Sequence, residues 1–166
     1  ASCLVGSEMC IRDRDSLDEI EFPENVKAMQ RNWIGRSRGA EIKFKIEESG
    51  AEISCFTTRP DTIFGVTFLT LSPEHPLCED LCRGTEWEEG WRNLRDECAR
   101  LSEFERINLL KEKKGVFLGQ HAINPLSGDR IPVYAGNFVV AGYGTGAVMA
   151  VPGHDQRDFD FAKTYD

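Results

Sequence analysis

Apolar and polar residues alternate strictly from Glu41 to Ile46, the pattern of a β-strand with one buried face. The turn-forming pair Ser49-Gly50 follows, and Glu52–Thr58 reads as a second strand, so we expect a β-hairpin. The segment Asn124–Asp129 has turn composition. Further strands are predicted at Ile63–Leu71, Arg130–Tyr134, Phe138–Ala141 and Ala147–Val151.

Helical spacing of apolar residues occurs in two other stretches. A helix is expected to open at Pro23 and to stop at Gly35, with Met29 and Trp33 as packing residues. Residues 76–114 are helical in pattern, and the last helix of this stretch is expected to close at Lys113-Lys114-Gly115. Within that stretch, possible capping boxes pair Thr85 with Glu88 and Ser102 with Glu105, and the apolar stripe comprises Trp87, Trp91, Leu94, Cys98 and Leu101.

The segment 142–158 combines glycines, a short apolar run and two carboxylates. After the strand Ala147–Val151, a helix should begin beyond Pro152-Gly153, with Asp155 as its N-cap and Asp158 in its first turn. The helix dipole favours ionised carboxylates there, which suits them to hold a cation such as an amino group.

Three other interpretations of this segment are open from the residues alone. The glycine spacing fits a dinucleotide-binding fingerprint, but Pro152 interrupts the long helix that such a fold needs. The residues His154, Asp155 and Asp158 offer metal ligands at a spacing of little specificity. Finally, both aspartates are candidates for purely structural helix capping.

Composition describes an ordinary globular domain with free thiols. The 166 residues are 40% hydrophobic and 29% charged, and the six cysteines lack the spacing of a zinc site. No apolar run approaches membrane-spanning length, and we expect no membrane association. The net charge of -8 argues against a broad basic face for nucleic acid. We divide the chain into residues 1–12, which fit nothing that follows and are interpreted as non-native, a junction helix and linker at 13–35, and a domain at 36–166.

Four segments in order resemble the leucyl-tRNA synthetase family. They are Met29–Ser37, Thr57–Gly65, Lys113–Phe117 with Ala122–Leu126, and Gly142–Asp158. The resemblance implies a mixed α/β (α+β) fold, namely the β-barrel-like editing domain of class I aminoacyl-tRNA synthetases with peripheral helices, incomplete at the C-terminus. The valyl and isoleucyl enzymes have similar domains, but the run Gly146–Asp155 looks leucyl.

The implied activity is post-transfer editing, the hydrolysis of the ester that joins a wrong amino acid to tRNA(Leu). Asp158 would anchor the substrate's α-amino group, and Thr57 and Thr58 would hydrogen-bond the ester and the terminal ribose. Thr62 would exclude leucine by bulk, and Arg59 would meet the tRNA end. The remaining predicted pocket residues are Tyr143, Met149, Val151, His154 and Asp155.

The resemblance further implies two partners, the 3′ end of mischarged tRNA(Leu) and the remainder of a cytoplasmic synthetase. Neither synthetic-site signature of the family is present, so ATP-dependent charging would lie elsewhere in the full-length enzyme. No nucleophile elbow or zinc site is found, so we expect no cofactor and no metal, with water as the nucleophile. The alternatives are a non-catalytic tRNA-acceptor or interaction module, and a valyl or isoleucyl editing domain.

Overall fold

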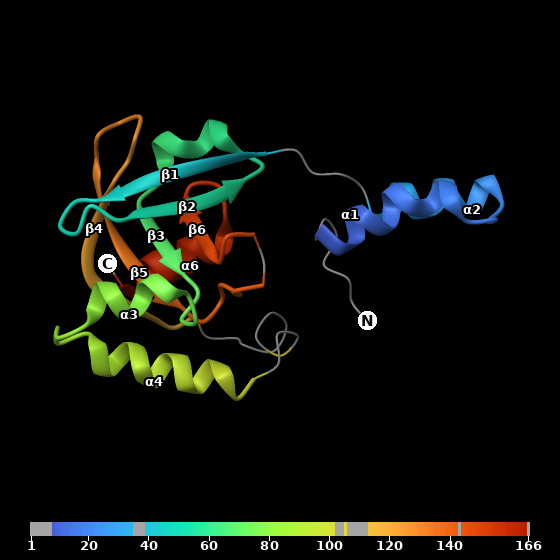
Figure 1. The fold of residues 1–166 in the computed structure, drawn as a ribbon. Coiled ribbons are helices and arrows are strands. Elements are labelled where there is room, and N and C mark those ends of the chain that lie inside the picture. The colour runs from blue at the N-terminus through green and yellow to red at the C-terminus, as the bar shows by residue number, and fades with distance from the viewer. Residues whose placement is uncertain (1–7, 35–38, 102–104, 106–112, 143, 166) are drawn as a thin grey trace. The chain divides into compact units, whose positions relative to one another are not determined.

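The computed structural model describes residues 8–34, 39–101, 105, 113–142 and 144–165, in two compact units, 1–38 and 39–166 (Figure 1). The first unit holds α1 (Glu8–Asp15), the 3₁₀-helix η1 (Ser16–Glu19) and α2 (Glu24–Ile34). The predicted helix is confirmed, since the carbonyl of Pro23 accepts the first bonds of α2. The side chains of Met29 and Trp33 are 69% and 76% exposed, so their predicted packing is not seen in the described part of the chain. The predicted boundary at 35/36 lies outside the described residues.

The predicted hairpin is present at the start of the second unit. Strand β1 (Ala40–Ile46) pairs antiparallel with β2 (Glu52–Thr57), and Phe44 lies opposite Ile53. Phe44 and Ile46 are fully buried, whereas Lys43 and Lys45 are exposed, as the alternation predicted.

Four more strands extend this hairpin into one curled sheet. They are β3 (Phe68–Leu71), β4 (Gly115–Ile123), β5 (Arg130–Gly136) and β6 (Ala147–Ala150), and the order across the sheet is β2-β1-β4-β5-β3-β6. Among the strands of the described segments, only β3 and β5 are parallel neighbours. The two edge strands β2 and β6 lie close together without pairing, so the sheet is barrel-like but open (Figure 1). The predicted mixed α/β class is confirmed.

A bulge in β4 contributes to the curl. The pairing of β4 with β5 shifts between Phe117 and His121, and Gly119 in that interval has φ +76°. A residue in this left-handed region bends its strand and increases the local twist. Glycine is favoured because L side chains rarely adopt that φ, and an added Cβ would also lie 3.1 Å from Cδ1 of Trp87.

Side-chain alternation divides the core between the two faces of the sheet. Leu69 and Leu71 of β3 belong to the main cluster, which also takes in helices α3 (Pro76–Cys82) and α4 (Glu88–Ala99). Phe68 points to the opposite face and packs on Phe161 of α6 (Gln156–Tyr165), with ring centroids 5.1 Å apart. Within the described ranges, no helix has the length and hydrophobicity needed to cross a membrane.

The prediction of helical structure within 76–114 is confirmed for α3 and α4, which are separated near Thr85, where the first capping box had placed a helix start. Lys113 and Lys114 lie outside any helix and lead directly into β4, so they do not close one. The predicted Thr85/Glu88 box is shifted, because the Glu88 carboxylate accepts from the backbone N–H of Gly84 at 2.7 Å. Ser102 lies outside the described residues, so its box is not addressed.

The prediction of a strand over Ile63–Leu71 is wrong in its first half, and Phe138–Ala141 forms no strand. Pro60–Gly65 is a 3₁₀-helix, η2, and β3 begins only at Phe68. At the second site, the N–H of Val139 bonds the carbonyl of Gly136 in a turn, at 3.2 Å. Apolar runs bury equally well in turns, so hydrophobicity alone did not identify these two segments.

The buried amide of Asn124, 1% exposed, holds η2 in place. Its Nδ2 donates to the carbonyl of Ile63 at 2.9 Å, while its Oδ1 accepts from the N–H groups of Leu126 and Ser127 at 3.0 and 3.3 Å. One side chain therefore links the β4–β5 turn to η2, far away in sequence.

Four free cysteines are buried, namely Cys55, Cys78, Cys82 and Cys98. Burial raises the pKa of the Cys55 thiol to about 12. Two histidines are held by local contacts: the N–H of Leu77 donates to Nδ1 of His75 at the start of α3, and Nδ1 of His121 lies 3.3 Å from Oε1 of Glu48.

Substituting Asn124→Ala should lower the free energy of unfolding by about 2 kcal/mol or more, because it leaves a buried carbonyl and two N–H groups without their partner. Urea denaturation of the chain measures this. The matched control is Asn93→Ala, at an exposed position of α4, which should change stability little. Equal effects at the two positions would contradict the structural role of Asn124.

Candidate functional site

The threonine-rich segment continues from the end of β2 into η2. The Oγ1 of Thr57 accepts the backbone N–H of Arg59 at 3.0 Å, which turns the chain out of the strand. Thr57 is half-buried and Thr58 is exposed. Thr57 has the same strand parity as Ile53 and Cys55, both in the main core, so it lies on the inner face of the curl.

Thr62 is 9% exposed, and its hydroxyl is engaged within η2. Both its backbone N–H and its Oγ1 donate to the carbonyl of Arg59, at 3.1 and 2.9 Å. This bond favours one side-chain rotamer, so the methyl group is held in a constant direction. A fixed, buried β-branched side chain is suited to exclusion by bulk.

Arg59 itself is exposed and paired. Its Nε donates to Oδ1 of Asp61 at 3.0 Å, and its Nη2 donates to Oδ2 of Asp61 at 2.8 Å. This bidentate pair lowers the pKa of the Asp61 carboxyl, and the nearby charge of His154 acts in the same direction.

The turn between β6 and α6 confirms the predicted cap. Oδ1 of Asp155 accepts from the backbone N–H groups of Arg157 and Asp158, at 2.7 and 3.3 Å. The Arg157 guanidinium returns to the same carboxylate at 3.0 Å. Its hydrogen bond is the main cause that lowers the pKa of Asp155. Asp155 is therefore fully engaged in shaping the turn.

Asp158 lies in the first turn of α6, as predicted, and its carboxylate points back to β6. Its Oδ2 accepts the backbone N–H of Val151 at 2.8 Å, and Oδ1 has no hydrogen-bond partner among the described residues. Burial raises the pKa of Asp158, and the neighbouring Asp155 adds to the rise, although the Val151 N–H opposes it. The helix N-terminus was expected to favour the ionised form, and at Asp158 burial outweighs that preference.

The curl brings this turn next to the threonine-rich segment. Strands β2 and β6 lie side by side (Figure 1), and a Cβ built on Gly65 would lie 3.2 Å from Cγ1 of Val151. Val151 belongs to the main core and the partly buried Met149 packs against it, on the inner face that Thr57 also occupies. Two walls therefore face each other, the threonine wall (Thr57–Gly65) and the acidic wall (Ala147–Asp158).

Of the other predicted pocket residues, His154 is exposed on the acidic wall and Tyr143 lies outside the described residues. Among the described side chains, no three of His, Cys, Asp and Glu converge as metal ligands would. Asp155 is occupied by Arg157 and the backbone, which disfavours the metal interpretation of His154, Asp155 and Asp158.

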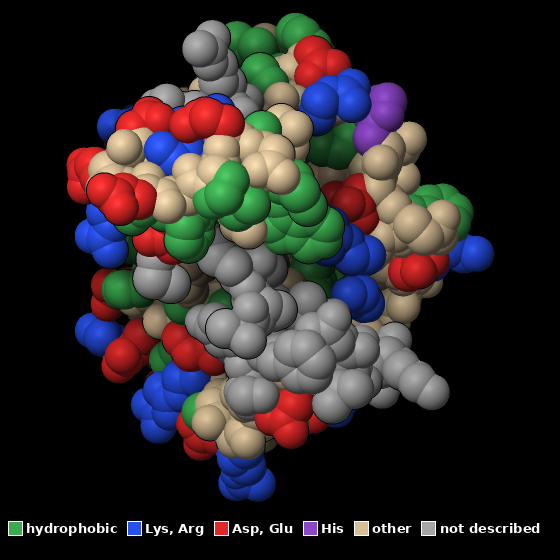
Figure 2. All heavy atoms as spheres, turned by 90° about the vertical axis from the view of Figure 1, so that its right-hand side faces the viewer, with side chains coloured by type: hydrophobic (Ala, Val, Ile, Leu, Met, Phe, Trp, Pro, Cys, Tyr) green, Lys and Arg blue, Asp and Glu red, His purple; other side chains and the backbone are tan. Residues whose placement is uncertain are grey.

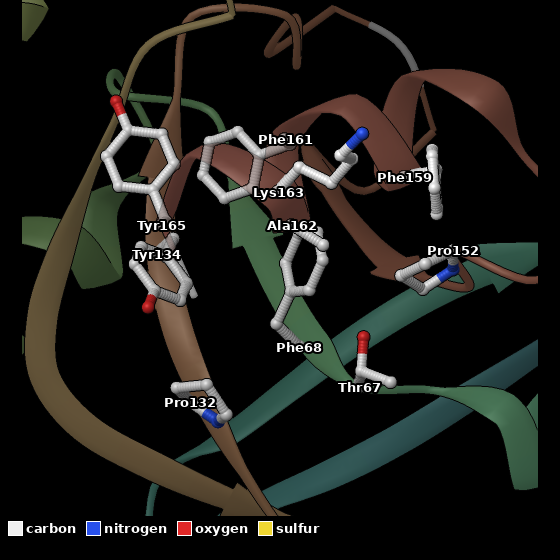
Figure 3. A pocket seen from close by; sticks show the side chains of 10 residues that line it. All are labelled: Thr67, Phe68, Pro132, Tyr134, Pro152, Phe159, Phe161, Ala162, Lys163 and Tyr165. Atoms are coloured by element: carbon white, nitrogen blue, oxygen red, sulfur yellow. The ribbon is translucent and has the colours of Figure 1, made fainter.

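A separate cavity of about 390 Å³ lies on the opposite face of the sheet, between β3, β5 and α6 (Figure 3). Its lining is mainly aromatic and includes Phe68, Tyr134, Phe161 and Tyr165. None of the predicted site residues lines it. The candidate site is therefore the paired walls and not this cavity.

The comparisons with known proteins agree with this architecture. A family model described as leucyl-tRNA synthetase, editing domain, matches residues 31–166. The chain therefore belongs to the family of leucyl-tRNA synthetase editing domains, which selects the leucyl assignment over the valyl and isoleucyl alternatives.

Two individual matches are much longer proteins. A leucine–tRNA ligase of Rubrobacter xylanophilus is 56% identical over 147 residues, which are 89% of this chain and 18% of the relative. A crystal structure of a leucyl-tRNA synthetase, Agrobacterium radiobacter K84 agnB2 LeuRS in a ternary complex with tRNA and LeuAMS, matches with a TM-score of 0.75 and 38% identity. That match covers 94% of this chain and 19% of the other, so the chain spans less than a fifth of the length of these relatives.

Sequence reasoning missed Lys113 as a neighbour of the acidic wall. Its ammonium lies 5.3 Å from the ring centroid of Phe138, and burial lowers its pKa while Asp155 and Asp158 act to raise it. The sequence had placed Lys113 at a helix end. Only the return of the chain into β4 brings it near α6, so local pattern held no signal for this position.

The two aspartates should have opposite effects on pH-dependent stability. Because the pKa of Asp158 is raised on folding, the native state holds that proton more tightly, and stability falls as the pH rises through its titration. The pKa of Asp155 is lowered, so its contribution is present above its ordinary range and is lost as the pH falls.

Relative to the wild type, Asp158→Asn should therefore gain stability between about pH 3 and about pH 6, and Asp155→Asn should lose it. Both asparagines can still accept the backbone hydrogen bonds. Urea unfolding at the two pH values measures the differences. Shifts of the same sign in both variants would contradict the assigned environments.

Proposed function

We propose that this chain is the editing module of a leucyl-tRNA synthetase and hydrolyses the ester that links a wrong amino acid to tRNA(Leu). The observation that carries this proposal is the pair of facing walls, one with the immobilised Thr62 and the other with the half-buried Asp158. Its partners would be the 3′ end of mischarged tRNA(Leu) and the remainder of the synthetase, acting in the cytoplasm. Residues 13–35 would form the junction and 36–166 the editing domain.

Asp158 would bind the α-ammonium group of the misattached amino acid through Oδ1. Its Oδ2 is already held by the Val151 N–H, so the carboxylate is oriented before substrate arrives. A cation at this partly desolvated position favours the ionised carboxylate, which offsets the rise in pKa caused by burial. Met149, Val151, His154, Asp155 and Tyr143 would complete this side of the pocket.

The threonine wall would hold the other end of the substrate. Thr57 and Thr58 would hydrogen-bond the ester and the terminal ribose. Water attacks the ester carbonyl, the bond to the ribose oxygen breaks, and that oxygen takes up a proton, releasing free amino acid and tRNA. The chain supplies positioning for this reaction, and the nucleophile is a water molecule.

Thr62 would provide the discrimination. An apolar pocket separates side chains that differ by one methylene by only about 1–3 kcal/mol, so the synthetic site alone passes errors such as isoleucine and norvaline. A second pocket that leucine does not fit removes those errors without attacking the correct product.

The proposal does not depend on a broad basic surface for RNA. On the face drawn in Figure 2, Lys and Arg side chains lie among Asp and Glu side chains, in keeping with the net charge of -8. The affinity for tRNA would therefore come mainly from the remainder of the synthetase, and this domain would contact the terminal nucleotides.

In the full-length synthetase, Asp158→Ala should lower kcat/KM for hydrolysis of isoleucyl-tRNA(Leu) at least about 30-fold, because an anchored charge pair of this kind contributes about 2–5 kcal/mol. Release of the amino acid from mischarged tRNA measures the rate. The control is Asp160→Asn, an exposed residue on the same helix, which should leave the rate unchanged. Near-normal turnover in Asp158→Ala would remove Asp158 from the site.

Thr62→Ala should make the enzyme hydrolyse correctly charged leucyl-tRNA(Leu), raising that rate at least about tenfold. Thr62→Val separates bulk from hydrogen bonding, since valine preserves the volume but cannot donate to the carbonyl of Arg59. Leucyl-tRNA should remain intact with Thr62→Val. If the alanine variant also spares leucyl-tRNA, Thr62 is not the discriminating residue. Wild-type enzyme that hydrolyses neither substrate would favour a non-catalytic tRNA-binding module.

A further inference from the structure

The segment between Thr57 and Thr62 converges on Arg59. Its backbone N–H bonds Thr57, and its carbonyl accepts both donors of Thr62. The backbone at Arg59 is therefore fixed by Thr57 and Thr62, to which the proposed function gives separate roles. The position of Arg59 is thus coupled to that of Thr62, the proposed discriminating residue.

The side chain of Arg59 is held by Asp61 alone among the described residues. Three N···O distances of 3.0, 3.3 and 2.8 Å join the guanidinium to the two carboxylate oxygens. Both side chains are exposed, at 63% and 61%, so the pair adds little to folding stability. The main effect of the Arg59–Asp61 pair is to fix the direction of the guanidinium.

The hydrogen bond from Arg59 is the main cause that lowers the pKa of the Asp61 carboxyl. Asp61 therefore carries its negative charge directly beside the Arg59 guanidinium, within the threonine wall.

The bidentate pair with Asp61 leaves Nη1 of the Arg59 guanidinium available as a donor. An arginine has five N–H donors in a rigid fork, and Asp61 occupies Nε and Nη2 while Nη1 has no partner among the described residues. Nη1 would then be presented in a defined direction to an anionic oxygen, and the phosphates of the tRNA 3′ end are the anions that reach this site.

We propose that Asp61 is a positioning residue that orients the Arg59 guanidinium to bind a backbone phosphate at the 3′ end of the tRNA. This inference rests on the proposed function. It predicts that removal of a negative charge from the exposed surface of the threonine wall weakens RNA binding, although simple electrostatics predicts the reverse, because a carboxylate repels phosphate.

Steady-state hydrolysis of isoleucyl-tRNA(Leu) by the full-length synthetase tests the inference. Asp61→Asn should raise KM about 5- to 20-fold and leave kcat nearly unchanged, because binding and not the chemical step is affected. The dependence of KM on salt concentration should also weaken by about one phosphate contact. Asp61→Glu, which keeps the carboxylate, should recover part of the loss.

The double variant Arg59→Ala/Asp61→Asn decides whether Asp61 acts through Arg59. If it does, the double variant should match Arg59→Ala alone, because the residue to be positioned is already gone. Asp80→Asn removes a comparable exposed partner, at 3.2 Å from Arg83 on α3, and should leave KM unchanged.

The inference is overturned if Asp61→Asn lowers KM or leaves it unchanged in an active enzyme, or if its effect persists in full without Arg59. In either case the editing assignment stands, because the wild type still hydrolyses the mischarged tRNA. A wild type without hydrolysis would instead overturn the proposed function and this inference together.

Discussion

The curl of the six-stranded sheet is the constraint on which the candidate site depends. Strands β2 and β6 stand at opposite ends of the strand order, and at about 4.8 Å per strand a flat sheet would hold them about 24 Å apart. Normal strand twist and the bulge at Gly119 bend the sheet until its two edges meet. The threonine wall and the acidic wall are thus neighbours only because β1, β4, β5 and β3 curve between them.

At the acidic wall, two aspartates, Asp155 and Asp158, differ in their hydrogen bonds and burial. Asp155 receives two backbone N–H groups and an arginine, so its charge is consumed in building the turn. Asp158, three residues further on, receives one N–H and is partly shielded from water, so burial raises its pKa. A turn made rigid by one carboxylate therefore holds the other in a fixed orientation.

Local signals predicted the elements whose causes are local. The hairpin followed from alternation, and the cap at Asp155 followed from a proline, a glycine and a carboxylate at helix spacing. The 3₁₀-helix η2 was missed because it is stabilised by a hydrogen bond from Asn124 to Ile63, sixty-one residues apart in the chain. The same reason explains Lys113, which the return of the chain into β4 brings near α6. The distribution of charges around the site is a product of tertiary structure, which residue spacing alone does not encode.

The buried thiols have a practical consequence. A thiol reacts with alkylating reagents only as exposed thiolate. Cys55 in β2 and Cys78, Cys82 and Cys98 in the helices are all buried, and burial also raises the pKa of the first three thiols. Modification therefore requires the chain to open first. The labelling rate of Cys55 reports excursions of the hairpin that supports the threonine wall, and the rates of the other three report excursions of α3 and α4. Comparison of these labelling rates therefore shows whether the hairpin or the helices α3 and α4 open more often.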